Sequence, residues 1–310
     1  MSECIGRREL LKSALATAAG VGAAKAIHLA GLPALQAAQP DGEPMPTRRL
    51  GKTGYQVRLF SLGGQSTIEQ EGRREDSVRI INRALDLGAN YIDTAEAYGK
   101  GISESYIGDV MKHRRKEVFL ATKTRDRTSE GTLRDCEASL KRLQTDYLDL
   151  YQHHAVHHDE QLEQIFAKDG SIHAFERLHK EGVIKHLGIT GHSPRVLLDA
   201  LKRYDYDCVL FTINPADIWM LDREYLDEFL ATAAEKDVGV IAMKVVARGR
   251  MFDSGVTMTQ LMRYALSFPV ATALVGITTP DQIDEDVAIA RAFEPLSQQE
   301  RAAIERRVKA

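Results

Sequence analysis

Four polar residues lie where the sequence predicts the ends of buried strands. Asp93, Tyr98, Lys123 and His154 each follow a short apolar run, and such runs are typical of parallel strands that are buried on both faces. The carboxyl ends of parallel strands meet at one rim of a closed sheet, so we expect these four side chains to lie together. A lone lysine of this kind is more often a solvated loop charge, whereas the ordered set indicates an active site.

The chemistry that this set predicts is proton transfer. A tyrosine hydroxyl is a weak acid, and a nearby ammonium favours its phenolate, so we expect Lys123 to lower the pKa of Tyr98. A buried ammonium needs a partner, and Asp93 is the carboxylate placed to keep it charged and oriented. A neutral His154 can donate a hydrogen bond to a substrate oxygen. Together the four predict a proton relay to a carbonyl group.

Five ordered segments resemble the aldo-keto reductase family, from about Arg48 to Asp286. They are Leu50-Gly-Lys-Thr-Gly54, Tyr91-Ile-Asp-Thr-Ala, Ala121-Thr-Lys123, Tyr147-Leu-Asp-Leu-Tyr-Gln-His-His154 and Gly276-Ile-Thr-Thr-Pro280. The resemblance implies that Asp93, Tyr98, Lys123 and His154 form the catalytic tetrad of that family. It also implies a (β/α)8 barrel that binds NADPH or NADH and transfers a hydride to a small aldehyde or ketone.

The pattern of apolar residues predicts the same α/β barrel in one domain, residues 48–310. Strands are expected at 59–63, 90–93, 118–122, 148–152, 186–190, 208–212, 238–243 and 273–276. Helices are expected at 77–87, 103–111, 132–143, 172–181, 194–203, 225–236 and 259–267, with an eighth opened by Pro280. A β-hairpin over residues 48–57 is expected to plug the barrel floor, and residues 297–308 to form an extra C-terminal helix.

The resemblance also indicates where the nicotinamide lies, with departures from the family pattern. Its amide is expected after the fifth strand, at Thr190 and Gly191, where the family usually has serine and asparagine. Gly191 has no side chain to replace the asparagine, and the adjacent His192 either compensates or lies in an exposed loop. Met243 stands where a ring-stacking tyrosine is common and offers a sulfur contact instead.

The rest of the nucleotide is expected along the first, seventh and eighth strand ends. These contacts are Gly64, Lys244, Arg248, Gly249, Gly276, Thr278, Gln282, Glu285 and Asp286. Cations and loop N–H groups suit a pyrophosphate, which favours Lys244 and the segment from Arg248 to Arg250 for that role, although solvated loop charge is the alternative. Gly276 and Gln282 are uncharged where NADPH-preferring relatives carry basic residues. We therefore predict weak discrimination in favour of NADPH.

Length and composition fit a single enzyme domain. The chain has 310 residues, of which 44% are hydrophobic and 27% charged, and this suffices for one barrel core. A net charge of -3 gives no global electrostatic footprint for nucleic acid. Cys136 and Cys208 belong to no Cys-x-x-Cys pattern, so an iron–sulfur centre lacks its ligands.

Residues 1–40 differ in kind from the rest. Gly6-Arg7-Arg8-Glu9-Leu10-Leu11-Lys12 precedes an apolar run rich in Ala and Gly, which resembles a twin-arginine export leader. The implied partner is the twin-arginine export machinery, and the implied location is the periplasm. An N-terminal amphipathic helix or a start-site artefact is the alternative, and the protein would then stay in the cytoplasm. The run is shorter than the ~20 residues that span a bilayer, so we expect no stable membrane span.

Two other functions compete with a reductase. The segment His153-His154-Ala-Val-His157-His158 lies at the predicted barrel mouth, where histidines can bind zinc and activate water, as in a metal-dependent hydrolase. The departures at the nicotinamide site favour a nucleotide-binding protein with little turnover. The substrate itself cannot be named, although Trp219 and Met220 suggest either an apolar pocket or core packing under a loop.

Overall fold

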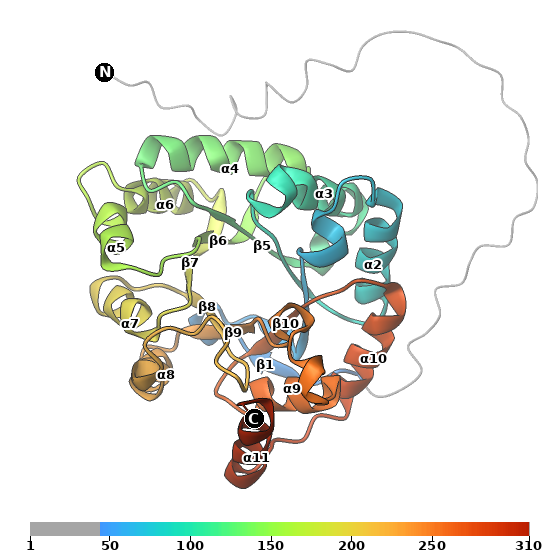
Figure 1. Cartoon of the computed structure of the whole chain (residues 1–310). Coiled ribbons are helices and arrows are strands. Elements are labelled where there is room, and N and C mark those ends of the chain that lie inside the picture. Colours follow the sequence, from blue (N-terminus) through green and yellow to red (C-terminus); the bar gives the residue numbers. More distant parts are fainter. Residues whose placement is uncertain (1–43, 310) are drawn as a thin grey trace, which may run out of the picture. The chain divides into compact units, whose positions relative to one another are not determined.

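A closed barrel of eight parallel strands forms the centre of the protein (Figure 1). The structure is a computed structural model that describes residues 44–309. Around the barrel the strands follow the chain as β3 (Phe60–Gly63), β4 (Tyr91–Asp93), β5 (Phe119–Thr124), β6 (Leu148–His153), β7 (Ile184–Gly191), β8 (Cys208–Thr212), β9 (Gly239–Met243) and β10 (Thr272–Gly276). β10 pairs with both β9 and β3, which closes the sheet.

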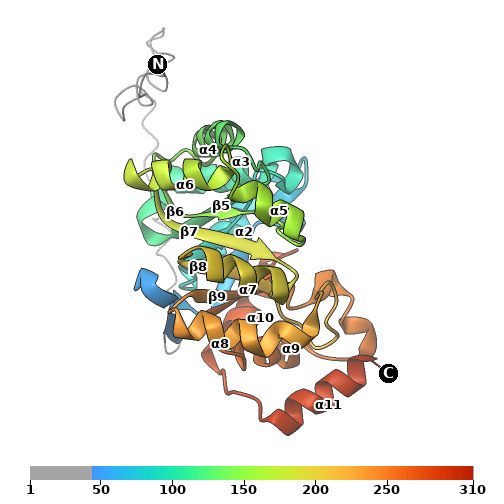
Figure 2. The same ribbon diagram turned by 90° about the vertical axis from the view of Figure 1, so that its left-hand side faces the viewer.

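Helices surround the strands in both views (Figures 1 and 2). They are α2 (Arg74–Asp86), α3 (Ile102–Arg114), α4 (Ser129–Leu143), α5 (Asp159–Ile165), α6 (Ser171–Lys180), α7 (Pro194–Arg203), α8 (Leu226–Glu235), α9 (Met258–Leu266) and α10 (Pro280–Arg291). A further helix, α11 (Gln298–Lys309), lies outside this ring. Its Glu305 accepts a hydrogen bond of 2.6 Å from Tyr264 of α9.

Short polar residues determine where several of these helices begin. Thr128 caps α4 by accepting the N–H of Gly131, and Ser193 caps α7 immediately before Pro194. α9 and α10 each start with a capping box, in which a threonine and a glutamine satisfy each other's backbone N–H groups. Because each helix starts at a fixed residue, the loop before it has a fixed length at the barrel mouth.

A β-hairpin closes the floor of the barrel. Strands β1 (Thr47–Arg49) and β2 (Gln56–Arg58) pair antiparallel, and Figure 2 shows the hairpin at the end of the barrel away from the arrowhead of β7. Leu50 and Val57 of the hairpin are fully buried in an inner cluster with barrel residues such as Phe119. The barrel interior is therefore packed at its floor, and its opening lies at the carboxyl ends of the strands.

The predicted fold is confirmed, including the hairpin and the extra C-terminal helix. Element ends differ by a few residues, and α5 was missed because only Leu162 and Ile165 of its seven residues are buried. The predicted leader, residues 1–40, lies outside the described residues. Within residues 44–309, no helix is long and apolar enough to cross a membrane.

Candidate active site

The barrel brings the four predicted catalytic residues to its open end. Asp93 is the last residue of β4, Lys123 lies near the end of β5, and His154 follows β6 directly. Tyr98 begins the short helical turn Tyr98–Gly101 after β4. Sheet register aligns Asp93 with Ala121, so Lys123 lies two residues further along β5 and reaches across the rim.

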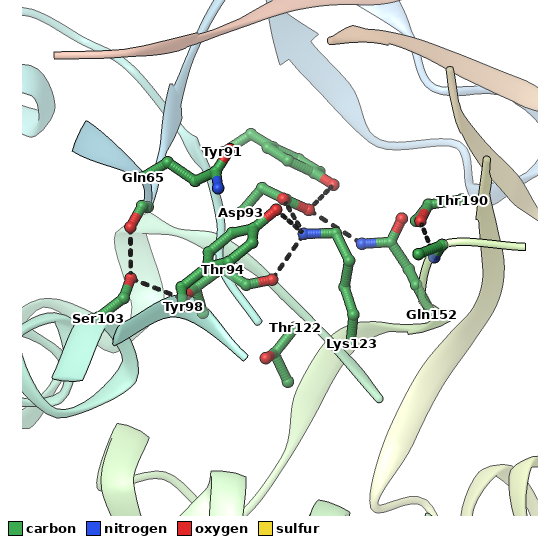
Figure 3. A network of polar contacts seen from close by, with 12 residues as sticks. Gln65, Tyr91, Asp93, Thr94, Tyr98, Ser103, Thr122, Lys123, Gln152 and Thr190 are labelled. Atoms are coloured by element: carbon green, nitrogen blue, oxygen red, sulfur yellow. Dashed lines mark hydrogen bonds and ion pairs between the residues drawn. The ribbon is translucent and has the colours of Figure 1, made fainter. Parts of the chain in front are cut away.

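Lys123 joins the tyrosine to the aspartate (Figure 3). Its Nζ donates to Asp93 Oδ1, to the carbonyl oxygen of Thr94 at 2.7 Å and to the Tyr98 hydroxyl oxygen at 3.4 Å. The Lys123 and Asp93 side chains are each 1% exposed. A lysine this deeply buried stays charged only beside a carboxylate, and Asp93 is that partner.

The protonation states of Tyr98 and Lys123 fit a proton donor beside a cation. Burial opposes the charge of Lys123, but Asp93 and Tyr98 outweigh it, and the pKa of Lys123 is raised. Burial also raises the pKa of Tyr98, and the opposing effect of Lys123 does not reverse this. Lys123 thus lowers the pKa of Tyr98, as expected, but its effect is smaller than that of removing the phenol from water, so the net pKa lies above the ordinary value. Tyr98 keeps its proton at neutral pH.

His154 is a neutral imidazole beside the phenol. Its ring is edge-on to that of Tyr98, with 5.6 Å between the ring centroids. Burial, followed by the charge of Lys123, lowers its pKa well below the ordinary value. Its Nδ1 is buried and has no hydrogen-bond partner within residues 44–309. A neutral ring in this position retains one N–H donor for a substrate oxygen.

Two residues of this network were missed by sequence reasoning. Gln152 donates from Nε2 to Asp93 Oδ2 at 2.9 Å, and the Tyr91 hydroxyl lies 3.4 Å from the same oxygen. Both side chains are fully buried. The available signal was a polar amide at the end of the predicted strand 148–152, two residues before His154, and the phenol of Tyr91 two residues before Asp93.

A cavity of about 660 Å³ opens beside the network, and Asp93 and Tyr98 line it. Most of the predicted nucleotide contacts line it too. They are Gly64, Met243, Lys244, Arg248, Gly249, Gly276, Thr278, Gln282, Glu285 and Asp286. Residues that were not predicted, among them Gln65 and Phe252, complete the wall. The cavity extends from the catalytic network to the start of α10, although the role of its residues in nucleotide binding stays a prediction.

Thr190 and Gly191 were also predicted to contact the nicotinamide, but they do not line this cavity. The Thr190 hydroxyl accepts the Ala155 N–H at 3.0 Å, and a side chain on Gly191 would collide with the Val156 carbonyl oxygen. Thr190 therefore holds the loop after β6, and Gly191 lets that loop pass close to β7. The neighbouring His192 is half-buried, with Nδ1 hydrogen bonded to Thr212, so it is not an exposed loop residue.

Charge is distributed unevenly along the cavity. Lys244 donates to the neutral Gln65 Oε1 at 2.6 Å and has no ion pair within residues 44–309. Burial, with Arg248 adding to it, lowers the pKa of Lys244 to about 8. At the α10 end, burial and then Glu285 raise the pKa of the Asp286 carboxyl to about 8. The loop after β9 is thus cationic, and the α10 end carries carboxyl groups.

The histidines at the barrel mouth point into different surroundings. His153 stacks on Phe175 with 3.9 Å between ring centroids, and its Nδ1 lies 3.1 Å from the Tyr206 hydroxyl. His157 Nδ1 accepts the His192 N–H at 3.1 Å. Within the part of the chain that the structure describes, no group of three or more His, Cys, Asp or Glu side chains is placed to hold a metal ion. The metal-hydrolase alternative therefore has no support.

Comparison with known proteins gives a consistent result. A model described as the aldo/keto reductase family matches residues 59–262. The chain is similar to the uncharacterized oxidoreductase YqkF of Bacillus subtilis (strain 168), with 30% identity over 217 residues, which are 66% of each chain. It is similar in structure to aldo-keto reductase AKR11C1 from Bacillus halodurans (holo form), with 27% identity and a TM-score of 0.71, over 85% of this chain and 96% of that one. An aldo/keto reductase from Klebsiella pneumoniae in complex with NADP and acetate has 25% identity and a TM-score of 0.66, over 84% and 94%.

Proposed function

Because this chain belongs to the aldo/keto reductase family and is an NAD(P)H-dependent oxidoreductase, we propose that Tyr98 is the proton donor in its reduction of carbonyl groups. The observation that carries this proposal is that Asp93 and Tyr98 line the cavity and are joined through Lys123. The Tyr98 hydroxyl holds the proton, and the Lys123 ammonium stabilises the phenolate left after its transfer. His154 orients the carbonyl oxygen towards that hydroxyl.

The cavity suits a nicotinamide dinucleotide. The residues that line it extend from Asp93 and Tyr98, past the loop after β9, to the start of α10. Lys244 is a half-buried ammonium with no ion-pair partner in residues 44–309, and a pyrophosphate would supply the missing negative charge. The nucleotide, when bound, supplies a hydride. Tyr98 then delivers the proton at its Oη to the substrate oxygen, and Asp93 keeps Lys123 charged throughout.

Replacement of the Tyr98 hydroxyl tests this assignment. Tyr98→Phe in the full-length protein is expected to lower kcat by about 100-fold or more, because the proton donor is lost, while NADPH and NADH still bind. Turnover is followed by the absorbance of the reduced nicotinamide with a panel of aldehydes, ketones and quinones. Nucleotide affinity is measured separately by fluorescence titration.

Tyr55→Phe is the matched control. The Tyr55 hydroxyl donates to the Asn90 carbonyl oxygen at the barrel floor, 3.0 Å away, so this variant also loses one phenol but should keep its turnover. Carbonyl reduction that persists at the wild-type rate in Tyr98→Phe would refute the proposed proton donor. Nucleotide binding without turnover in the wild-type protein would instead favour a nucleotide-binding protein.

We further propose that residues 1–40 direct the protein through the twin-arginine route to the periplasm. The support is the Arg7-Arg8 pair ahead of an Ala- and Gly-rich run. Replacing both arginines by lysine is expected to retain the protein in the cytoplasm, as measured by fractionation of a bacterium with a twin-arginine system. Equal export of the wild-type and Arg7→Lys/Arg8→Lys proteins would exclude this route.

A further inference from the structure

Gln152 is the one polar side chain from β6 that bonds directly to the Asp93 carboxylate within residues 44–309. The bond runs from Nε2 to Oδ2 over 2.9 Å, and both side chains are buried (Figure 3). We propose that Gln152 is a positioning residue of the reductase, whose amide holds Asp93 so that its other oxygen stays on Lys123. This inference rests on the proposed catalytic role of Tyr98.

The barrel register explains how Gln152 reaches Asp93 across an intervening strand. Lys123 and Gln152 are direct neighbours in the pairing of β5 with β6. Side chains alternate along a strand, so Gln152 shares the inner face with Leu150, which belongs to the barrel's inner cluster. Tyr151 and His153 face outward and stack on Phe175 of α6. Lys123 and Gln152 therefore both extend from adjacent strands towards the same carboxylate.

Apart from its hydrogen bond to Asp93, the buried Gln152 amide is unfavourable for the stability of the fold. Its Oε1 is buried and has no hydrogen-bond partner within residues 44–309. A buried acceptor without a hydrogen bond is unfavourable, whereas a leucine of similar size would fill the same space without that penalty. The hydrogen bond from Nε2 to a carboxylate is the favourable interaction that offsets this penalty.

Gln152 is also the stronger of the two side-chain donors at Asp93 Oδ2. The Tyr91 hydroxyl is 3.4 Å away, which is long for an O–H to oxygen bond, whereas the Gln152 contact has ordinary length. Without the amide, the carboxylate is free to rotate about its last torsion and to weaken its hold on Lys123. A less firmly held ammonium stabilises the Tyr98 phenolate less well, so proton transfer should slow.

Several ionisable groups lie around Gln152 and Asp93, and their titration contributes to the pH dependence of activity in every variant. Asp93 and Tyr91 come from β4, Tyr98 and His154 from the loops after β4 and β6, Glu69 from the turn after β3, and Lys244 from the loop after β9. Removal of the Gln152 amide leaves all of these groups in place. A change in the pH profile is therefore attributable to the altered Asp93–Lys123–Tyr98 chain.

The test compares Gln152→Leu with Gln152→Glu, using 4-nitrobenzaldehyde reduction and the reverse oxidation of its alcohol. Gln152→Leu should lower kcat on the order of tenfold, with KM for the nucleotide nearly unchanged, and should move the alkaline rise of the oxidation rate to higher pH. Gln152→Glu should regain activity as the pH falls, because a protonated carboxyl can donate to Asp93 and an ionised one cannot.

Ser61→Ala is the control for loss of a buried hydrogen bond in a barrel strand. Ser61 Oγ lies 2.7 Å from Thr272 Oγ1, and this pair has no contact with the tetrad. The Ser61→Ala variant should have a lower free energy of unfolding but unchanged pH profiles of activity. If Gln152→Leu does not fold, the activity of Gln152→Glu at low pH is the deciding measurement. If Gln152→Glu does not regain activity as the pH falls, the positioning role of Gln152 is refuted.

The proposal for Gln152 and the proposal for Tyr98 fail in different ways. Wild-type kcat and pH profiles in folded Gln152→Leu would overturn the positioning role, even though Tyr98→Phe is inactive. Full activity in Tyr98→Phe would instead remove the catalytic assignment on which the positioning role depends.

Discussion

At the scale of single residues, the candidate active site depends on charges held away from water. Lys123 is stabilised by Asp93, whereas Lys244 has only the neutral Gln65 as a side-chain hydrogen-bond partner within residues 44–309. Burial favours the neutral form of both lysines, but Asp93 and Tyr98 outweigh it at Lys123, whose pKa is raised, whereas the pKa of Lys244 falls to about 8. We infer that Lys244 is available for a phosphate, whereas Lys123 is already committed to the tetrad.

The affinity for the nucleotide should therefore depend on pH. A phosphate binds the protonated Lys244, so affinity is full below about pH 8 and falls as the pH rises through this value, by up to about tenfold per unit. Asp286 has a pKa of about 8 and acts in the same direction, because it gains negative charge over the same range. Fluorescence titration from pH 6.5 to 9.5 measures the effect.

Two substitutions separate these contributions. Lys244→Arg stays charged throughout this range and should flatten most of the pH dependence, whereas Asp286→Asn should remove only the part that belongs to the carboxyl. An unchanged slope in Lys244→Arg would assign the effect to Asp286 instead.

At the scale of elements, the floor hairpin and the loops at the mouth have different tasks. The hairpin inserts Leu50 into the barrel core, and its backbone packs directly on the start of β9, where the Lys52 N–H donates to the Asp237 carbonyl oxygen at 2.7 Å. The loops at the opposite end carry Tyr98, His154 and Lys244. Stability and chemistry are thus placed at opposite ends of the strands, as is general for this barrel.

Two glycines of the hairpin test its role as a plug. Gly51 has a φ of +49°, and a Cβ there would lie 2.2 Å from the Gly239 nitrogen, whereas Gly54 has a φ of +72° and open space around it. Gly54→Ala should cost only the backbone strain, about 1–2 kcal/mol in the free energy of unfolding. Gly51→Ala should cost clearly more, because backbone must also move. Urea denaturation compares them, and equal losses would contradict close packing at Gly51.

At the scale of the whole molecule, one cavity connects the tetrad to the start of α10. Its lysine and arginine lining residues, Lys244 and Arg248, both come from the loop after β9. The wall at α10 instead presents Gln282, Glu285 and Asp286. The Gln282 side-chain oxygen accepts the Thr278 N–H at 2.8 Å, so it already has a structural task. A 2'-phosphate at this end would meet carboxyl groups, whereas a ribose hydroxyl could donate to them.

We therefore expect NADPH to bind no more than about tenfold more tightly than NADH, a difference of about 1.4 kcal/mol. Glu285→Arg should shift the ratio towards NADPH, because it replaces a carboxylate of the cavity wall by a cation. Asp281→Arg is the matched control, since it makes the same charge change on an exposed residue of the same helix. A strong preference of the wild-type protein for NADPH would reject this expectation.

The sequence by itself predicted the barrel, which the structure confirms, and placed four polar residues at its rim, whose catalytic role stays a proposal. Period and length of the apolar runs identify strands and helices, and residues at strand ends must meet at the rim once the sheet closes. That is why Asp93, Lys123 and His154 could be assigned together although they are far apart in the chain. The segment α5 escaped because so few of its residues are buried that its pattern was too weak to detect.

Only the tertiary structure decided how burial and neighbours set each side chain's state. The pKa of Tyr98 is raised because the cost of removing a phenolate from water exceeds the effect of Lys123, and no spacing of residues reveals that balance. Thr190 stabilises the loop after β6 because strand β7 places its hydroxyl where it accepts the Ala155 N–H. Gln152 reaches Asp93 because sheet register sets it beside Lys123. Contacts between strands depend on closure and register, which local sequence does not specify.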